Sequence, residues 1–300
     1  MPNFTVCLTH DVDRIRKTYQ YLTHDVRKGR FGNFKTLFNG KFPYWMFEKI
    51  MNIEEKYGVR STYFFLQETI RFKPFLPSNW KLSLGRYRVT EPAVASMIRD
   101  LDTGGWEIGL HGSYNSYKDI GLLKAEKSVL EDVLGKQVTG IRQHYLNLDI
   151  PETWQLQREA GFEYDASYGK KRDIGWQENK YQPFVDESSG MYVIPLALME
   201  CYLFSKAHND PEKAWQFTRN LMDEAEDNNA LFTVLWHQRM FNEEEYPGYA
   251  NVYRKIIEEG KSRGAEFVTC GQIYAAHKNT NSPQKAPSPQ SERGWGVRHL

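Results

Sequence analysis

The N-terminal segment ends in three ionisable residues within four positions. The apolar residues 4–8 and Thr9 predict a strand, and His10, Asp11 and Asp13 follow directly. Because side chains alternate along a strand, Asp11 and Asp13 share one face and His10 points the other way, although a bend after Thr9 could gather all three. Two neighbouring carboxylates either share a proton or bind a cation. The alternative is an aspartate-rich turn, or a helix cap ahead of residues 14–17, in which the basic residues only pair with the acids.

Ionisable side chains also follow later predicted strands. His111, Arg142, Asp165 and His237 come after segments 106–110, 138–141, 162–164 and 231–236. Helices are predicted over residues 45–57, 90–104, 120–134, 151–160, 210–227 and 248–263. This alternation predicts parallel strands with crossover helices, in a barrel or a doubly wound sheet. The polar strand ends favour the barrel, because there they converge on one mouth.

The residue types at this mouth suit metal-assisted hydrolysis. Taken alone, His111 or His237 would fit a core histidine whose ring is hydrogen-bonded to a backbone carbonyl. Together with two carboxylates, they form a ligand set for zinc or a similar divalent ion. Such an ion activates water and polarises a carbonyl, while a spare carboxylate and imidazole serve as base and acid. We therefore expect hydrolysis of an amide or ester.

With these residues in view, the chain resembles the polysaccharide deacetylases, metal-dependent carbohydrate esterases that remove acetyl groups from N-acetylated sugars. Residues 9–13, Thr-His-Asp-Val-Asp, are similar to the first family motif, which implies Asp11 as general base and Asp13 as metal ligand. Residues 111–115, His-Gly-Ser-Tyr-Asn, are similar to the second motif and imply His111 as ligand. Asn115 stands where the family usually has its second histidine, and we take it as the third ligand; Ser116, His144 or water are the alternatives.

The later motifs occur in the family's order. Residues 142–145, Arg-Gln-His-Tyr, are similar to the third motif. By that resemblance Arg142 holds the base, and the backbone amide of Tyr145 faces the developing oxyanion. Residues 235–237, Leu-Trp-His, match the final motif and imply His237 as general acid. Asp165 and Trp176 lie where substrate loops are expected, so we predict substrate binding for both, with structural roles as the alternative.

The resemblance implies an α/β fold, a distorted (β/α)7 barrel of the polysaccharide deacetylase type. We predict one such domain over residues 1–278. Residues 279–300 are rich in Asn, Ser, Pro, Gln and charge, which predicts a disordered tail.

Composition narrows the range of partners. The chain of 300 residues has a formal net charge of +1 and lacks the basic block typical of a nucleic-acid-binding protein. Three scattered cysteines, Cys7, Cys201 and Cys270, predict buried thiols in a reducing compartment. The longest apolar run, residues 191–204, contains Pro195 and Glu200, so no membrane span is predicted. We therefore expect a cytoplasmic protein; the sequence gives no oligomeric state.

These observations lead to three functional hypotheses. The first is a deacetylase with a bound divalent metal, Zn²⁺ before Co²⁺, Ni²⁺ or Fe²⁺, that acts on a small-molecule or oligosaccharide substrate bearing an N-acetyl group during surface-polysaccharide synthesis. The second is a carbohydrate-binding relative that has lost catalysis, suggested by Asn115 and by the 14% aromatic content. The third retains the chemistry but removes formyl or hydrolyses another linear amide.

Overall fold

A curled, mostly parallel sheet forms the centre of the protein. The computed structural model describes residues 4–18, 20–21 and 42–281. Its strands lie in the order β6-β7-β5-β4-β3-β2-β1-β9-β8, and β10 also pairs with β1. Their bounds are β1 (Thr5–Val12), β2 (Thr62–Leu66), β3 (Glu107–Gly112), β4 (Gly140–Gln143), β5 (Tyr164–Asp165), β6 (Phe184–Val185), β7 (Tyr192–Val193), β8 (Leu198–Met199), β9 (Leu231–Leu235) and β10 (Glu266–Phe267).

One continuous segment connects the two ends of this sheet. Strand β7 pairs with β5. Strand β8, which is separated from β7 by four residues, pairs with β9. Between them the backbone N–H of Ile194 donates to the carbonyl of Asp165, and that of Ala197 donates to the carbonyl of Thr233. The parallel strands β1 to β5, this segment and β9 therefore curl into a distorted barrel. The predicted fold class is confirmed.

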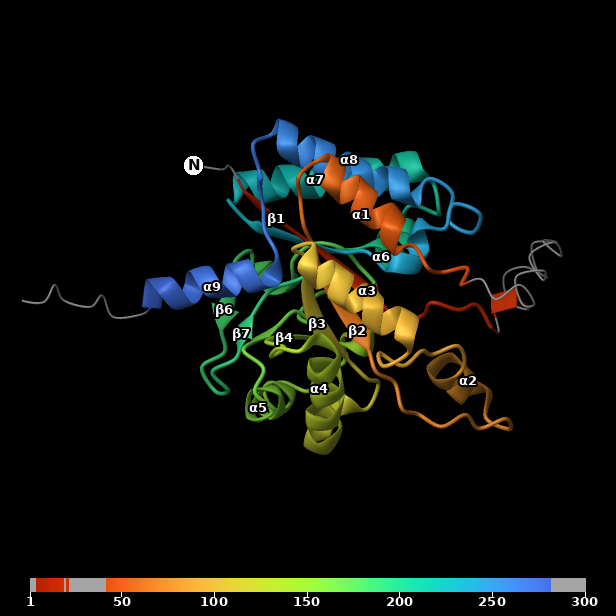
Figure 1. Ribbon diagram of the computed structural model, residues 1–300. Helices are drawn as coiled ribbons and strands as arrows, with labels where there is room; N and C mark the ends of the chain where they lie inside the picture. Colours follow the sequence, from red (N-terminus) through yellow and green to blue (C-terminus); the bar gives the residue numbers. More distant parts are fainter. Residues whose placement is uncertain (1–3, 19, 22–41, 282–300) are drawn as a thin grey trace, which may run out of the picture.

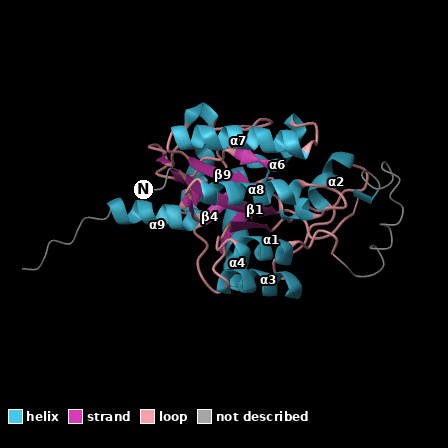
Figure 2. Ribbon diagram, turned by 90° about the horizontal axis from the view of Figure 1, so that it is seen from above, coloured by secondary structure: helices cyan, strands magenta, loops and turns pink. Residues whose placement is uncertain are grey.

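Helices cover the outside of the curled sheet (Figures 1 and 2). Six of them correspond to predicted segments, namely α1 (Phe47–Lys56), α3 (Pro92–Thr103), α4 (Ile120–Leu134), α5 (Glu152–Glu159), α7 (Pro211–Asp227) and α8 (Tyr249–Ser262). Local signals explain them: the Asp210 carboxylate accepts from the backbone N–H groups of Glu212 and Lys213 ahead of α7, and Gly135 (φ 76°) ends α4. None of the helices in the described ranges is long and apolar enough to cross a bilayer.

Three helices were not predicted: α2 (Pro77–Ser83), α6 (Glu200–Lys206) and α9 (Cys270–Asn281). Helix α9 continues three residues past residue 278, the predicted end of the domain. Residues 282–300, the rest of the predicted tail, lie outside the described residues, so the disorder predicted for them stays a prediction.

The side chain of His10 faces outward from the barrel, as strand alternation predicts. Its Nε2 atom lies 2.9 Å from Oε1 of Glu54 on α1 and 3.1 Å from the hydroxyl of Tyr253 on α8. Its Nδ1 atom lies 2.7 Å from the carbonyl oxygen of Trp236. His10 therefore belongs to the interface between the sheet and the helices, whereas Asp11 and Asp13 face the inside.

Candidate metal and catalytic site

Three buried side chains from three strand ends converge at the mouth of the barrel. Asp13 follows β1, His111 lies near the end of β3, and His144 follows β4. One ligand atom from each lies within 4.8 Å of the others. Oδ1 of Asp13 is 3.3 Å from Nε2 of His111 and 3.6 Å from Nε2 of His144. The predicted convergence of Asp13 and His111 is therefore present, and His144 is the third member.

The hydrogen bonds of His111 define what its second nitrogen can do. Its Nδ1 atom lies 2.9 Å from the carbonyl oxygen of Arg142, which can only accept, so Nδ1 carries a proton. Its Nε2 atom and Oδ1 of Asp13 are both buried and have no hydrogen-bond partner among the described residues. With Nδ1 protonated, neutral His111 directs an Nε2 lone pair at a carboxylate oxygen. A lone pair and a carboxylate oxygen repel each other at this distance unless a cation lies between them. That cation is either a second proton on the imidazole or a metal ion.

The donor set fits a divalent metal. Ligands that lie 2.0–2.1 Å from a tetrahedral zinc ion are roughly 3.3 Å apart. The separations from Asp13 to the two histidines are close to this value. One carboxylate and two imidazoles suit zinc and its first-row neighbours better than Mg²⁺ or Ca²⁺. Asp13, His111 and His144 are therefore the residues that would hold the ion.

The charges around Asp13 favour its ionised form. Burial alone would raise the pKa of this carboxyl group, but His144, His237 and His111 together hold it well below its usual range. Burial lowers the pKa of His144, against the attraction of Asp13. An ionised carboxylate beside a neutral imidazole is the protonation state that binds a metal.

A second carboxylate, Asp11, is held by a buried arginine. Nη1 of Arg142 donates to Oδ1 of Asp11 over 3.0 Å and to the hydroxyl of Thr9 over 2.7 Å. Its Nε donates to the carbonyl of Ala166 over 2.8 Å. Oδ2 of Asp11 remains directed toward the metal ligands, 3.6 Å from Nε2 of His111. If the triad held a divalent ion, Asp11 would be placed beside it and could accept a proton.

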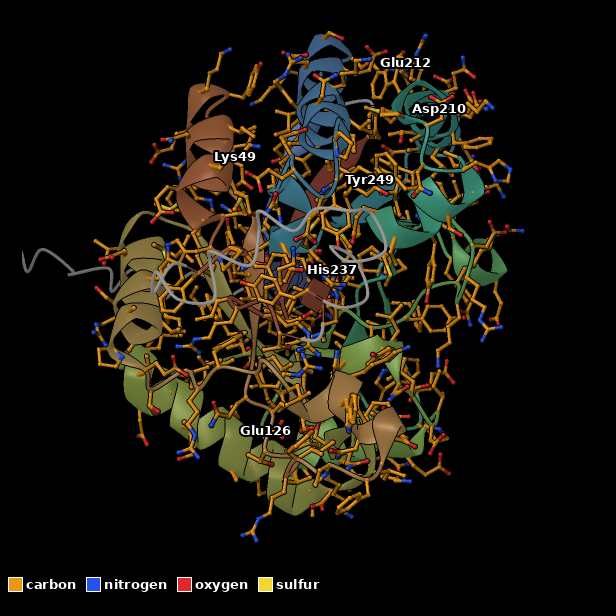
Figure 3. The ribbon with its side chains drawn as sticks, turned by 90° about the vertical axis from the view of Figure 1, so that its right-hand side faces the viewer. Lys49, Glu126, Asp210, Glu212, His237 and Tyr249 are labelled. Atoms are coloured by element: carbon orange, nitrogen blue, oxygen red, sulfur yellow. The ribbon has the colours of Figure 1, made fainter. Side chains whose placement is uncertain are left out.

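A third imidazole, His237, stands on the other side of Asp13. It lies at the centre of the face shown in Figure 3, and its Nε2 is 3.8 Å from Oδ2 of Asp13. Its Nδ1 is 2.6 Å from Oε1 of Glu200, a fully buried carboxylate at the start of α6. Burial lowers the pKa of His237, but Glu200 and Asp13 outweigh it and raise the value to about 9. His237 therefore carries a proton at neutral pH, as a general acid must.

Comparison with known proteins supports the fold. No family model matches the sequence, and no curated protein matches it. Among solved structures, the chain is similar to a protein of Mycobacterium smegmatis provisionally assigned as a polysaccharide deacetylase, with a TM-score of 0.57 and 18% identity, covering 96% of this chain and 95% of that one. It is also similar to Puue allantoinase, with a TM-score of 0.60 and 15% identity over 93% of this chain and 92% of that one. The chain has the polysaccharide deacetylase fold.

The same fold includes a protein without activity. A CE4 family pseudoenzyme from Bacillus anthracis has a TM-score of 0.50 and 11% identity, with 91% of this chain and 66% of that chain covered. A mutant of that protein is described as having restored enzymatic activity. The deacetylase fold is thus shared by active and inactive proteins, and the residues of the site must decide between them.

The structure corrects the predicted third ligand from Asn115 to His144. Asn115 is exposed and lines a hollow with Arg71 and Lys73. The chain turns after Ser113, and the buried side chain facing inward is that of Ser116, whose hydroxyl lies 3.0 Å from the carbonyl of Ser113. Strand alternation could have identified His144, because it lies two residues beyond the inward-facing Arg142.

Glu200 is the functional residue that the sequence reasoning missed. It directly follows strand β8, and its carboxylate is the partner of His237. A carboxylate directly after an apolar segment is the same signal that singled out Asp11 and Asp13. In the sequence, Glu200 interrupts the longest apolar run, and this position hides its relation to His237, 37 residues farther along the chain.

The three predicted substrate-binding residues have different environments. Tyr145 is 52% exposed beside the site, with φ at 60°, and its ring centroid is 4.4 Å from that of His144. The predicted role of its backbone amide stays a prediction. Trp176 is buried, and its Nε1 donates to the carbonyl of Leu231 over 3.0 Å. We correct its predicted role, because it is a core residue.

Asp165 is also structural. It is completely buried, and burial raises its pKa. It accepts hydrogen bonds from Nε2 of Gln157 and from both the backbone N–H and the hydroxyl of Ser167. Ser167 in turn accepts from the backbone N–H of Gln143 at the end of β4. We correct its predicted role: Asp165 braces the strand that carries Arg142.

Proposed function

We propose that this protein is a metal-dependent hydrolase that removes the acetyl group from an N-acetylated sugar, in the cytoplasm and during the synthesis of a surface polysaccharide. The observation that carries the proposal is the geometry around Asp13. A metal-ligand triad, an arginine-held carboxylate and a protonated imidazole lie within hydrogen-bonding or ion-pair distance of one another. The deacetylase fold supports this proposal.

Asp11 would act as the general base. Arg142 and Thr9 fix its position, so that Oδ2 faces the triad and can accept a proton from the attacking water. When bound, a divalent ion supplies Lewis acidity toward water and the amide carbonyl. The guanidinium of Arg142 keeps the negative charge of Asp11 paired in a buried place.

His237 would act as the general acid. After the attack, the leaving nitrogen must take up a proton before the C–N bond breaks. Nε2 of His237 faces the triad, while Nδ1 is bonded to Glu200, so the proton available for transfer lies on the nitrogen directed at the site. Asp11 and His237 flank the triad, and base and acid therefore act from different directions.

A second candidate is the hydrolysis of another linear amide, including a formyl group. The fold similarity to an allantoinase, which hydrolyses a C–N bond other than that of an N-acetyl group, supports a change of substrate on this scaffold. Both candidates use the same residues. The catalytically lapsed alternative is disfavoured by the presence of Asp11, Arg142 and His237 in bonded positions.

The test is acetate release from a panel of N-acetylated sugars by protein loaded with Zn²⁺, Co²⁺, Ni²⁺ or Fe²⁺. We expect acetate release for at least one combination of sugar and metal. In Asp11→Asn the rate of that release should fall by about 10²-fold or more. Asp132→Asn, which changes an exposed aspartate on α4, is the matched control and should retain full activity. Formate or ammonia release without acetate would favour the second candidate. Full activity of Asp11→Asn would reject the proposal. So would a protein that binds none of the four metals and releases no product from any substrate.

A further inference from the structure

A basic pocket lies directly beside the proposed reaction centre. It has a volume of about 420 Å³, and its lining includes Lys81 from α2, Lys171 and Arg172 from the segment after β5, and three tyrosines, Tyr114, Tyr145 and Tyr202. A neighbouring hollow of about 560 Å³ shares Tyr114 and adds Arg71 and Lys73.

The three tyrosines connect the pocket to the catalytic residues. Tyr145 follows the metal-ligand candidate His144 directly, Tyr114 lies three residues after His111, and Tyr202 lies two residues after Glu200. The rings of Tyr114 and Tyr145 meet edge to face with their centroids 5.7 Å apart. A molecule in the pocket would therefore extend from the metal site along the aromatic surface.

The lining of the pocket has an excess of positive charge. Within the described ranges, no Asp or Glu oxygen lies within 4.0 Å of the charged nitrogens of Lys81, Lys171 or Arg172. Residues 69–90, which carry one wall, contain five basic residues and no Asp or Glu. Burial raises the pKa of the Tyr202 phenol, and the nearby charge of Arg172 opposes that rise. In a chain with a net charge of +1, this local excess indicates an anionic ligand.

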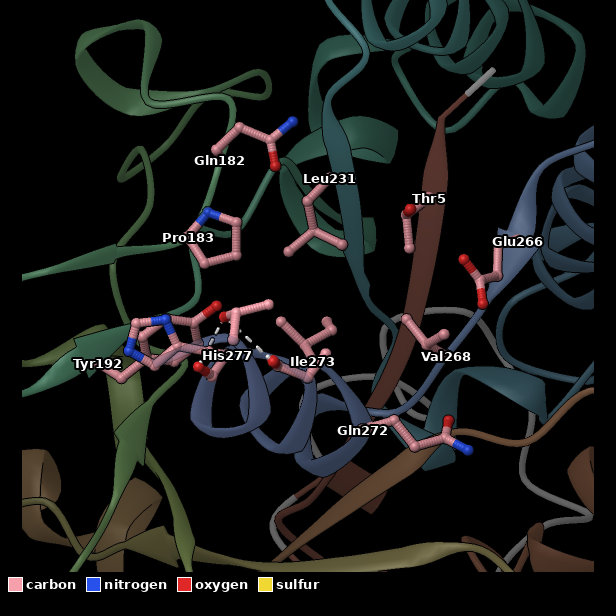
Figure 4. A pocket seen from close by; sticks show the side chains of 12 residues that line it. Thr5, Gln182, Pro183, Tyr192, Leu231, Glu266, Val268, Gln272, Ile273 and His277 are labelled. Carbon is pink, nitrogen blue, oxygen red and sulfur yellow. Dashed lines mark hydrogen bonds between the residues drawn. The ribbon is translucent and has the colours of Figure 1, made fainter. Parts of the chain in front are cut away.

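Another pocket of the molecule provides a contrast. The pocket in Figure 4, of about 560 Å³, is lined by Thr5, Tyr192 and Leu231, the first residues of β1, β7 and β9, so it lies at the end of the barrel away from the site. Its lining contains Glu266 and His277 but no Lys or Arg. This pocket therefore lacks the basic side chains found in the two pockets at the mouth that holds the site.

We propose that the basic pocket binds a phosphate group of the substrate, so that the acylated sugar is a glycosyl phosphate or diphosphate ester and not a neutral saccharide. This inference rests on the proposed function. The pocket offers three positively charged side chains, those of Lys81, Lys171 and Arg172. A ligand with a single carboxylate would neutralise only one of them, whereas a diphosphate carries at least two negative charges. The tyrosine rings offer apolar faces on which a sugar can stack.

The phosphate ester could come from a soluble nucleotide diphosphate sugar or from a polyprenyl diphosphate sugar in a membrane. The test measures binding to the metal-loaded protein by calorimetry with UDP-N-acetylglucosamine, and by flotation with vesicles containing undecaprenyl diphosphate N-acetylglucosamine. We expect one of the two to bind. Lys171→Gln/Arg172→Gln should weaken that binding at least tenfold and reduce its salt dependence. Lys213→Gln/Arg219→Gln, on the exposed face of α7, is the matched control and should bind normally.

The outcomes separate this inference from the proposed function. Binding that depends on Lys171 and Arg172 supports the pocket, even if no acetate is released, in which case only the proposed function fails. No binding of either ester, or binding that the double variant leaves unchanged, overturns the pocket. Acetate release with equal kcat/KM from neutral and phosphorylated sugars, in both wild type and double variant, would also overturn it while the proposed function stands.

Discussion

The side chains of His144 and Asn115 allow a direct test of the metal ligands. His144 lies 3.6 Å from Asp13 inside the mouth, whereas Asn115 is exposed. We expect His144→Ala to lose zinc affinity by about 100-fold or more, because one of three ligands is removed, and Asn115→Ala to bind zinc as the wild type does. Zinc content after dialysis against a graded chelator measures both. The reverse result, with zinc lost from Asn115→Ala alone, would return the third ligand to Asn115.

The carboxylate of Glu200 should set the alkaline limit of the proposed activity. The charge of Glu200 raises the pKa of His237 to about 9, against burial, which lowers it. A general acid must be protonated, so kcat/KM should fall as pH rises through that pKa. Glu200→Gln keeps an acceptor oxygen but removes the charge, and we expect the alkaline limb to move to lower pH by about one unit or more.

The readouts for this variant are the pH dependence of kcat/KM and an NMR titration of the His237 imidazole. Glu212→Gln changes an exposed glutamate on α7 and serves as control, with no expected shift. Glu200 does not set the charge of His237 if, in Glu200→Gln, both the alkaline side of the kcat/KM profile and the titration of the His237 imidazole are unchanged.

The sequence predicted much of this site, for a physical reason. Period-two alternation along a strand placed Asp11 and Asp13 together and His10 outside, and the polar strand ends identified His111 and His237. It could not give the turn after Ser113, because that path depends on tertiary contacts such as the bond from Ser116 to Gln143 on β4. Motif spacing alone therefore selected Asn115 incorrectly.

At the scale of the elements, one buried carboxylate connects helices to the barrel. Glu54 on α1 accepts hydrogen bonds from Nε1 of Trp106 and the hydroxyl of Ser61 through Oε2, and from the Tyr253 hydroxyl through Oε1. Oε1 also lies 2.9 Å from Nε2 of His10. Through His10, this cluster reaches the carbonyl of Trp236 and so the backbone next to His237, the proposed general acid.

Replacing this carboxylate should destabilise the whole domain. In Glu54→Gln the amide nitrogen faces buried donors and the charge opposite His10 is lost, so we expect the free energy of unfolding to fall by about 3 kcal/mol. Glu55→Gln, the exposed neighbour, should change it by less than about 0.5 kcal/mol. Urea denaturation followed by circular dichroism measures both. Equal stability of the two variants would show that the cluster contributes little.

Elements with strong local signals were predicted well, and those without them were missed. Helix α7 follows an Asp210-Pro211 cap and α4 ends at a left-handed glycine, so sequence indicated both. Helix α6 follows Met199 with no side-chain cap, in an apolar run that suits a strand equally. Its start depends on β8 pairing with β9, a contact between distant parts of the chain.

At the scale of the whole molecule, a bound metal should couple to folding, because its candidate ligands come from the ends of three different strands. Asp13, His111 and His144 come from segments that are far apart in the unfolded chain, so the complete site exists only in the folded barrel. A metal at 100 times its Kd stabilises the folded state by about 2.7 kcal/mol. For a domain of this size, that corresponds to a rise in Tm of about 5 °C.

We expect Zn²⁺ to produce this rise in metal-free protein, and Mg²⁺ to produce less, because two of the candidate ligands are imidazoles. Differential scanning calorimetry with both ions measures the effect, and His144→Ala should show a much smaller response to Zn²⁺ than the wild type. If Zn²⁺ raised Tm equally in wild type and His144→Ala, the ion would be bound elsewhere, and the hydrolase mechanism derived from this triad would have to be abandoned.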